Sequence, residues 1–131
     1  METKMREIKF RAWDKENKMW LRDDSTHITL NGYIFSCQDG NCITNTYRQV
    51  NDKVVLVEFT GLKDKNGKEI YEGFVYDHSD GLVVVEWNIK ACCFEAVFIA
   101  ERDSNIPVWE IEFLGCNYVG NIHANPELLK A

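Results

Sequence analysis

A chain of 131 residues with 45% hydrophobic and 27% charged side chains fits one domain with a sizeable core. Its apolar runs are too short to span a bilayer and its first residues lack the apolar core of a signal peptide, so we expect a cytoplasmic protein. Residues 1–22 carry seven basic and four acidic side chains and residues 74–131 carry three and nine, a balance that disfavours general nucleic-acid binding outside the N-terminal end.

The first 21 residues are expected to form a β-hairpin. Residues 8–12 alternate apolar and basic side chains, which is the period of a half-buried strand. A polar turn at residues 14–18 separates them from the apolar residues 19–21, which resume the extended pattern.

A second hairpin is predicted around the dipeptide Asn31-Gly32, which lies between the β-prone residues 27–30 and 33–35. Asn-Gly favours a type I′ turn, in which both central residues take a positive φ. From residue 36 to residue 52 the pattern fades, and we expect mainly loop there.

The middle of the chain predicts a central strand followed by a tight turn. Residues 54–59 are rich in β-branched side chains, as central strands are. The segment from Thr60 to Gly73 is polar, with three glycines, and residues 64–67 of it read as a turn. Gly73 predicts a bulge or bend before a strand at residues 74–76.

The rest of the chain predicts further strands between turn signals, at residues 82–87, 94–100, 108–113 and 118–122. Residues 94–100 fit a strand or a helix, and the neighbouring strands favour a strand. Residues 108–113 alternate charged and apolar side chains, which is typical of a half-exposed strand after a break at residues 104–107. Asn125 as N-cap and Pro126 as first helical residue predict a short C-terminal helix. The pattern indicates an all-β barrel or sandwich.

Three blocks occur in an order typical of one known family. They are Ile8 to Asp14 with Met19 following, Thr60 to Asp64 continuing to Glu72-Gly73, and Gly120 to Ile122 followed by Asn125 to Leu129. On these blocks the chain resembles the YopX family, small proteins encoded by phages and prophages of Gram-positive bacteria. The resemblance implies an all-β fold with an SH3-like barrel in its later portion and a bacterial cytoplasm, and it implies no reaction.

The resemblance also divides the chain. We expect one YopX-like domain over residues 1–131, with N-terminal hairpins and a variable region at residues 1–53 and a barrel-like core at residues 54–131. The family usually has an acidic residue directly after the last glycine of the second block. Here Phe74 stands at that position.

The motifs that could carry chemistry are better explained as turns. Asp64 begins a faintly calcium-loop-like stretch, but Lys68 stands where a fifth-position ligand would be, and a cation cannot bind Ca²⁺. His78-Ser79-Asp80 contains the residue types of a hydrolase triad, yet adjacent residues cannot meet across a fold, so a hairpin tip is expected. The sequence therefore predicts no catalytic residue and no enzyme.

The five cysteines, an odd number, form neither a disulfide framework nor a C-x-x-C metal pair, so reduced thiols are expected. A zinc site from His27, Cys37 and Cys42 is an alternative. Cys92 and Cys93 are expected to point to opposite faces of a strand, one buried and one exposed. Neither a metal nor another cofactor is predicted.

The leading hypothesis is a non-enzymatic module that binds a partner protein or a second copy of itself, the latter because edge strands such as residues 108–113 need covering. One alternative is nucleic-acid binding through the basic N-terminal hairpin, with Trp13 stacking on bases. The other is an acidic DNA mimic that blocks a host nuclease. The candidate interaction surface consists of Lys9, Arg11, Trp13, Lys63, Lys65 and Tyr71. Trp13 and Tyr71 could anchor a partner or be packed in the core.

Overall fold

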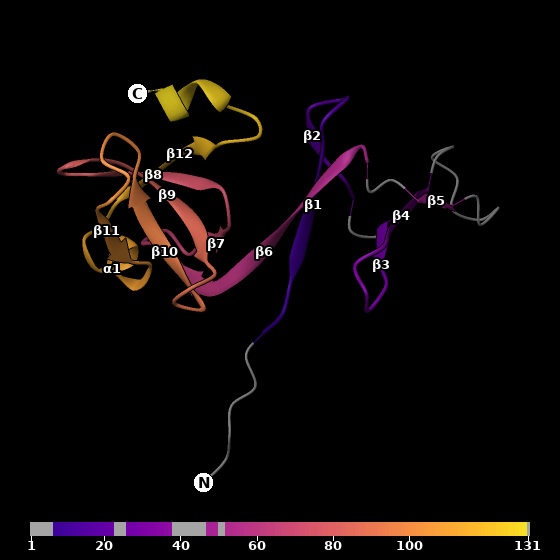
Figure 1. Cartoon of the computed structure of the whole chain (residues 1–131), viewed down its shortest axis with the longest axis horizontal. Helices are drawn as coiled ribbons and strands as arrows, with labels where there is room; N and C mark the ends of the chain where they lie inside the picture. Colours follow the sequence, from indigo (N-terminus) through magenta and orange to yellow (C-terminus); the bar gives the residue numbers. More distant parts are fainter. Residues whose placement is uncertain (1–6, 23–25, 38–46, 50–51, 131) are drawn as a thin grey trace, which may run out of the picture. The chain divides into compact units, whose positions relative to one another are not determined.

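A computed structural model of the chain describes residues 7–22, 26–37, 47–49 and 52–130 (Figure 1). The chain divides into two compact units. The small unit is Arg11–Leu56, and the large unit combines Met1–Phe10 with Val57–Ala131. Strands dominate both units, so the all-β prediction is confirmed. The SH3-like character of the later part stays a prediction.

The predicted N-terminal hairpin is confirmed in the small unit. Strand β1 (Phe10–Asp14) pairs antiparallel with β2 (Met19–Trp20), and Trp13 lies opposite Trp20. The two indole rings meet edge to face at 5.0 Å between centroids. The Asp14 carboxylate accepts hydrogen bonds from the backbone of the following turn, which fixes the reversal of the chain.

The second predicted hairpin is also present, but its predicted turn type is wrong. Among the described residues Gly32 has a φ of 89°, whereas Asn31 does not have a positive φ. The Gly32 N–H donates to the Thr29 carbonyl at 3.0 Å, and the Thr29 N–H donates to the Tyr33 carbonyl at 2.9 Å. These bonds close a three-residue loop with a left-handed last residue, the next commonest hairpin connection after the two-residue turn.

The hairpin belongs to a three-stranded antiparallel sheet in the order β3-β4-β5. Its strands are β3 (Thr26–Ile28), β4 (Ile34–Cys37) and β5 (Tyr47–Gln49). Strand β5 occupies a place where loop was expected, so that part of the prediction is wrong. The rest of the expected loop, at residues 38–46, lies outside the described residues.

A four-stranded sheet has the order β2-β1-β6-β7, and a five-stranded sheet has the order β11-β10-β9-β8-β12. The bounds of the remaining strands are β6 Val54–Lys63, β7 Glu69–Tyr71, β8 Phe74–His78, β9 Gly81–Asn88, β10 Cys93–Phe98, β11 Asn105–Pro107 and β12 Asn117–Asn121. The strands predicted at residues 54–59, 74–76, 82–87, 94–100 and 118–122 are therefore confirmed. The core of the large unit lies in β8 and β9, where Val75 and the run Val83 to Val85 are fully buried.

The strand predicted at residues 108–113 is wrong. This segment is the short helix α1 (Trp109–Phe113), and strand β11 lies just before it, where a break was predicted. Val108 and Ile111, three residues apart, are buried, whereas Trp109 and Phe113, four residues apart, are exposed. In so short a segment the apolar residues 109, 111 and 113 fit the period of a strand, while residues 108 and 111 fit the spacing of a helix. The alternation alone therefore does not distinguish a strand from a helix here. The argument that an edge strand at residues 108–113 needs covering by a second copy of the chain therefore no longer applies.

The C-terminal helix is present, but it is the 3₁₀-helix η3 (Pro126–Lys130). Asn125 does not act as the predicted side-chain N-cap. Its Oδ1 accepts a hydrogen bond from the Asn121 backbone instead, while the Asn121 side chain accepts bonds from the backbone N–H groups of His123 and Ala124. The turn before η3 is thus held by the Asn125 side chain, which reaches back to Asn121, and by the Asn121 side chain, which reaches forward to His123 and Ala124.

The half-buried His123 gives the large unit a pH dependence. Burial lowers the pKa of His123 below its ordinary value of 6.5. Between the folded pKa and 6.5 the unfolded chain binds a proton that the folded chain does not, so the free energy of unfolding falls as the pH drops through this window. His123→Gln should flatten this slope, as measured by urea unfolding at several pH values from about 7.5 to about 5. An equal slope in the variant would refute the assignment.

Candidate interaction groove

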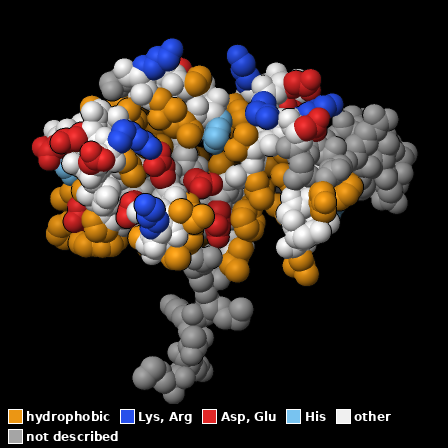
Figure 2. Space-filling view, in the orientation of Figure 1, with side chains coloured by type: hydrophobic (Ala, Val, Ile, Leu, Met, Phe, Trp, Pro, Cys, Tyr) orange, Lys and Arg blue, Asp and Glu red, His pale blue; other side chains and the backbone are white. Residues whose placement is uncertain are grey.

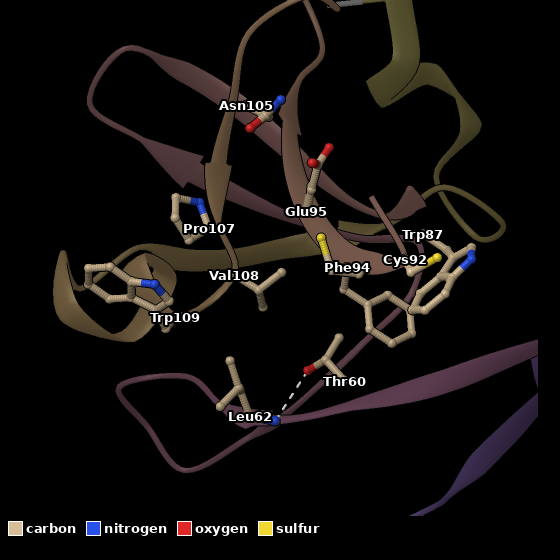
Figure 3. A pocket seen from close by; sticks show the side chains of 11 residues that line it. Thr60, Leu62, Trp87, Cys92, Phe94, Glu95, Asn105, Pro107, Val108 and Trp109 are labelled. Atoms are coloured by element: carbon tan, nitrogen blue, oxygen red, sulfur yellow. Dashed lines mark hydrogen bonds between the residues drawn. The ribbon is translucent and has the colours of Figure 1, made fainter. Parts of the chain in front are cut away.

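An open groove of about 470 Å³ lies on the large unit (Figure 3). Its lining is mostly apolar and comes from β6, β9, β10, β11 and α1, with Leu62, Trp87, Phe94, Pro107, Val108 and Trp109 as the apolar members. In Figure 3 Thr60 and Leu62 of β6 face the others across the groove. Segments far apart in the sequence therefore build one hollow.

One aromatic wall of the groove is a cross-strand pair. Trp87 of β9 lies opposite Phe94 of β10, and their rings meet edge to face at 5.0 Å between centroids. Val85 is two residues before Trp87 and points to the same side of the sheet, where it is fully buried. The face that fills the core thus continues outward to Trp87, which stays 43% exposed. The pairing holds this exposed indole in place.

The second exposed indole belongs to α1. Trp109 lines the groove and is 55% exposed, and its ring meets that of Phe113 at 5.9 Å between centroids. Phe113 and the following Leu114 are also exposed. Figure 2 shows hydrophobic side chains gathered where Figure 1 draws α1 and β11. The apolar surface therefore extends from the groove over the helix.

The polar residues of the groove are largely engaged or acidic. The Thr60 hydroxyl donates to the Ile70 carbonyl at 2.8 Å and accepts from the Leu62 N–H at 3.2 Å. Glu95 is the charged member of the lining and lies opposite Glu86 in the β9–β10 register. The Arg102 guanidinium donates to Glu86 at 2.6 Å, and the described residues give Glu95 no ion pair.

The two aromatic residues predicted as partner anchors are buried. Trp13 is 6% exposed and packs on Trp20, and Tyr71 is 5% exposed. The Tyr71 ring lies between those of Phe59 and Phe74, at 5.5 and 5.6 Å between centroids. Both residues are therefore packed in the protein interior, which was the alternative to a role as partner anchors. A buried Trp13 is also poorly placed to stack on nucleic-acid bases.

Three residues of the predicted interaction surface, Lys9, Lys63 and Tyr71, lie around the carboxylate of Glu69. The Lys9 ammonium donates to Glu69 at 2.5 Å, the Tyr71 hydroxyl donates to it at 3.3 Å, and Lys63 lies opposite it in the β6–β7 register. The hydrogen bond from Lys9 is the main reason that the pKa of Glu69 is lowered, and the carboxylates of Glu69 and Glu7 raise the pKa of Lys9.

The last two residues of the predicted interaction surface are Lys65 and Arg11. Lys65 is exposed in the turn after β6. The Arg11 guanidinium lies 4.1 Å from the centroid of the Trp20 ring, in the small unit.

The groove residues were not singled out from the sequence. Helical spacing of Trp109 and Phe113, and Trp87 at the end of a buried run, are the signals that could have found them.

The turn interpretations of the reactive-looking motifs agree with the structure. The Asp64 carboxylate, 3% exposed, accepts hydrogen bonds from the N–H groups of Asn66 and Lys68, at 2.9 and 3.0 Å. His78 accepts a hydrogen bond from the Asp80 N–H at a hairpin tip. Within the described residues no group of three or more His, Cys, Asp or Glu side chains could hold a metal ion.

The prediction for the adjacent cysteines is wrong, since both Cys92 and Cys93 are exposed. Cys92 has a φ of 54° and lies in the turn before β10, so the alternation of a strand does not apply to it. Cys42 of the alternative zinc site lies outside the described residues. In the part of the chain that the structure describes, no helix has the length and apolarity needed to cross a membrane.

One comparison with known proteins identifies a family. A family model described as YopX protein matches residues 9–130. Among solved structures, the chain is similar to the crystal structure of protein EF1440 from Enterococcus faecalis, with 25% sequence identity and a TM-score of 0.61. The similarity covers 93% of this chain and 97% of that one. No curated protein matches the chain.

Proposed function

The chain belongs to the YopX family, and on this premise we propose that it is a non-enzymatic phage or prophage protein that binds a partner protein in the bacterial cytoplasm. The observation that carries the proposal is the groove with its two exposed indoles. Tryptophan is over-represented among the residues that dominate binding energy at protein interfaces. The groove is therefore the surface on which we place the interaction.

The groove is suited to binding because its aromatic side chains are already held. Trp87 is supported by Phe94, and Trp109 is supported by Phe113. Association costs about 0.5–1.5 kcal/mol for each flexible side chain that must be immobilised, and supported rings avoid much of this cost. Burying such rings against a partner also removes a large apolar area from water.

The polar lining favours binding over catalysis. A cysteine nucleophile is commonly activated by an adjacent base such as histidine, and the groove lining holds Cys92 and Cys93 but no histidine. Glu95 is a single carboxylate, whereas acid–base hydrolysis of a sugar, for example, uses two. These features support an interaction module and give no support to an enzyme.

Removing either indole should abolish most of the binding. Peptides about ten residues long, selected from a random library against the intact protein, are the probe. We expect Trp109→Ala and Trp87→Ala each to raise Kd for the selected peptides by at least about tenfold, because hot-spot truncations typically cost 2 kcal/mol or more. Isothermal titration calorimetry measures the change.

Leu129→Ala is the matched control, because Leu129 is an exposed apolar residue that does not line the groove. Its Kd should equal that of the unchanged protein. Selected peptides that bind all three variants equally would show that the groove is not the binding surface.

A further inference from the structure

The chemistry of the groove also indicates its occupant. Resting on the proposed function, we infer that the groove takes an extended, proline-containing segment of the partner that carries a lysine or arginine beside its apolar residues. Three features of the groove support this: the state of its main-chain edges, its aromatic faces and its charge.

Neither wall of the groove is suited to pairing with a partner strand. Strand β11 is an edge strand of only three residues, and it ends at Pro107, which has no N–H to donate. On the opposite wall, the Leu62 N–H is already bonded to the Thr60 hydroxyl, next to Gly61, whose φ is 93°. The register of β6 with β7 is irregular across this stretch. The groove must therefore recognise its occupant through side chains.

A polyproline II segment meets that requirement. It has three residues per turn and no internal hydrogen bonds, and it docks into aromatic-lined grooves without a ladder of main-chain bonds. The groove presents the supported rings of Trp87 and Phe94, and Trp109 stands at its other end beside Pro107 and Val108 (Figure 3). Because proline restricts the free peptide, little entropy is lost on binding.

The charge of the groove selects a basic segment. Glu95 lies among the lining residues, on the opposite face of β10 from Phe94, and the lining contains no lysine or arginine. Glu86, which stands opposite Glu95 in register, is already paired with Arg102. Helix α1 adds Glu110 and Glu112. Residues 57–131 as a whole carry six basic and thirteen acidic side chains. A cation on the partner would meet Glu95 and be attracted over a longer range, whereas an acidic segment would be repelled.

Selection from the same random peptide library tests the inference. We expect the selected sequences to be enriched in proline and in lysine or arginine. A synthetic peptide of the consensus should lose at least about tenfold in affinity when its basic residue becomes glutamate, and again when its prolines become glycine. Its affinity should fall as salt rises.

Glu95→Lys should reverse the preference between the basic and the glutamate peptide, and Glu95→Gln should reduce it. Glu101→Lys makes the same change of charge at an exposed residue outside the groove lining and should leave the preference intact. Peptides that require Trp109 but show no enrichment in proline or basic residues would overturn this inference and leave the proposed function standing. Peptides indifferent to Trp109 would overturn both.

Discussion

Replacing Phe74 with alanine is expected to lower the free energy of unfolding by about 3–5 kcal/mol. Phe74 is 1% exposed, and its ring packs against Tyr71 and Tyr118, at 5.6 and 5.1 Å between centroids. The truncation removes apolar contact and leaves a cavity among large rings that can collapse only in part. Guanidinium unfolding followed by near-ultraviolet circular dichroism measures the change in the large unit.

Phe113→Ala is the matched control for this prediction. It makes the same chemical change at a residue that is 77% exposed, so the free energy of unfolding should change by no more than about 0.5 kcal/mol. A loss as large at Phe113 as at Phe74 would contradict the packing account. A shifted midpoint with an unchanged denaturant slope in the Phe74→Ala variant would show that its stability itself was altered.

Phe74 stands at the position where the family resemblance of the sequence implies an acidic residue. The Lys68 ammonium lies 5.6 Å from the Phe74 ring centroid and 3.3 Å from that of Tyr118. An acidic side chain at position 74 would have this ammonium within reach as a counterion. In this chain the ammonium lies over the Phe74 and Tyr118 rings, as in a cation–π contact.

Gly73→Ala is expected to lower the free energy of unfolding by about 2–3 kcal/mol. Gly73 has a φ of 86°, which costs a residue with a Cβ about 1–2 kcal/mol. The added Cβ would also stand 3.2 Å from the His123 Nε2 atom, closer than ordinary contact. The same guanidinium titration measures the loss.

Two further variants separate these causes. Gly67 has a φ of 79° and open space around it, so Gly67→Ala should show the backbone cost alone. Adding His123→Ala should make Gly73→Ala cost the same as Gly67→Ala, because the steric contact is then gone. A difference between the two glycine variants that persists without the His123 ring would refute the steric explanation.

Most strands and turns could be predicted from the sequence because their signals are local. The turn at Asp64 to Gly67 is an example, since the Asp64 carboxylate bonds to backbone groups only two and four residues away. Helix α1 could not be predicted, because the burial of Ile111 and of Val108 just before the helix is fixed by packing against the rest of the large unit.

The groove could not be predicted from the sequence for a related reason. Trp87 and Phe94 come together through the register of β9 with β10, and Thr60 faces them from β6. Strand pairing and register decide these distances, and no local pattern contains them. Conversely, Trp13 and Tyr71 looked available in the sequence, but cross-strand aromatic neighbours bury them.

The close approach at Gly120 has an evolutionary consequence. A Cβ at this position would stand 2.4 Å from the Asn125 Oδ1 atom and 3.3 Å from a methyl group of Leu128. The bulge in β12 and the start of η3 therefore share one small space. Among relatives of this chain, we expect a side chain at position 120 to occur only together with a smaller residue at position 125. The two positions should thus vary as a pair.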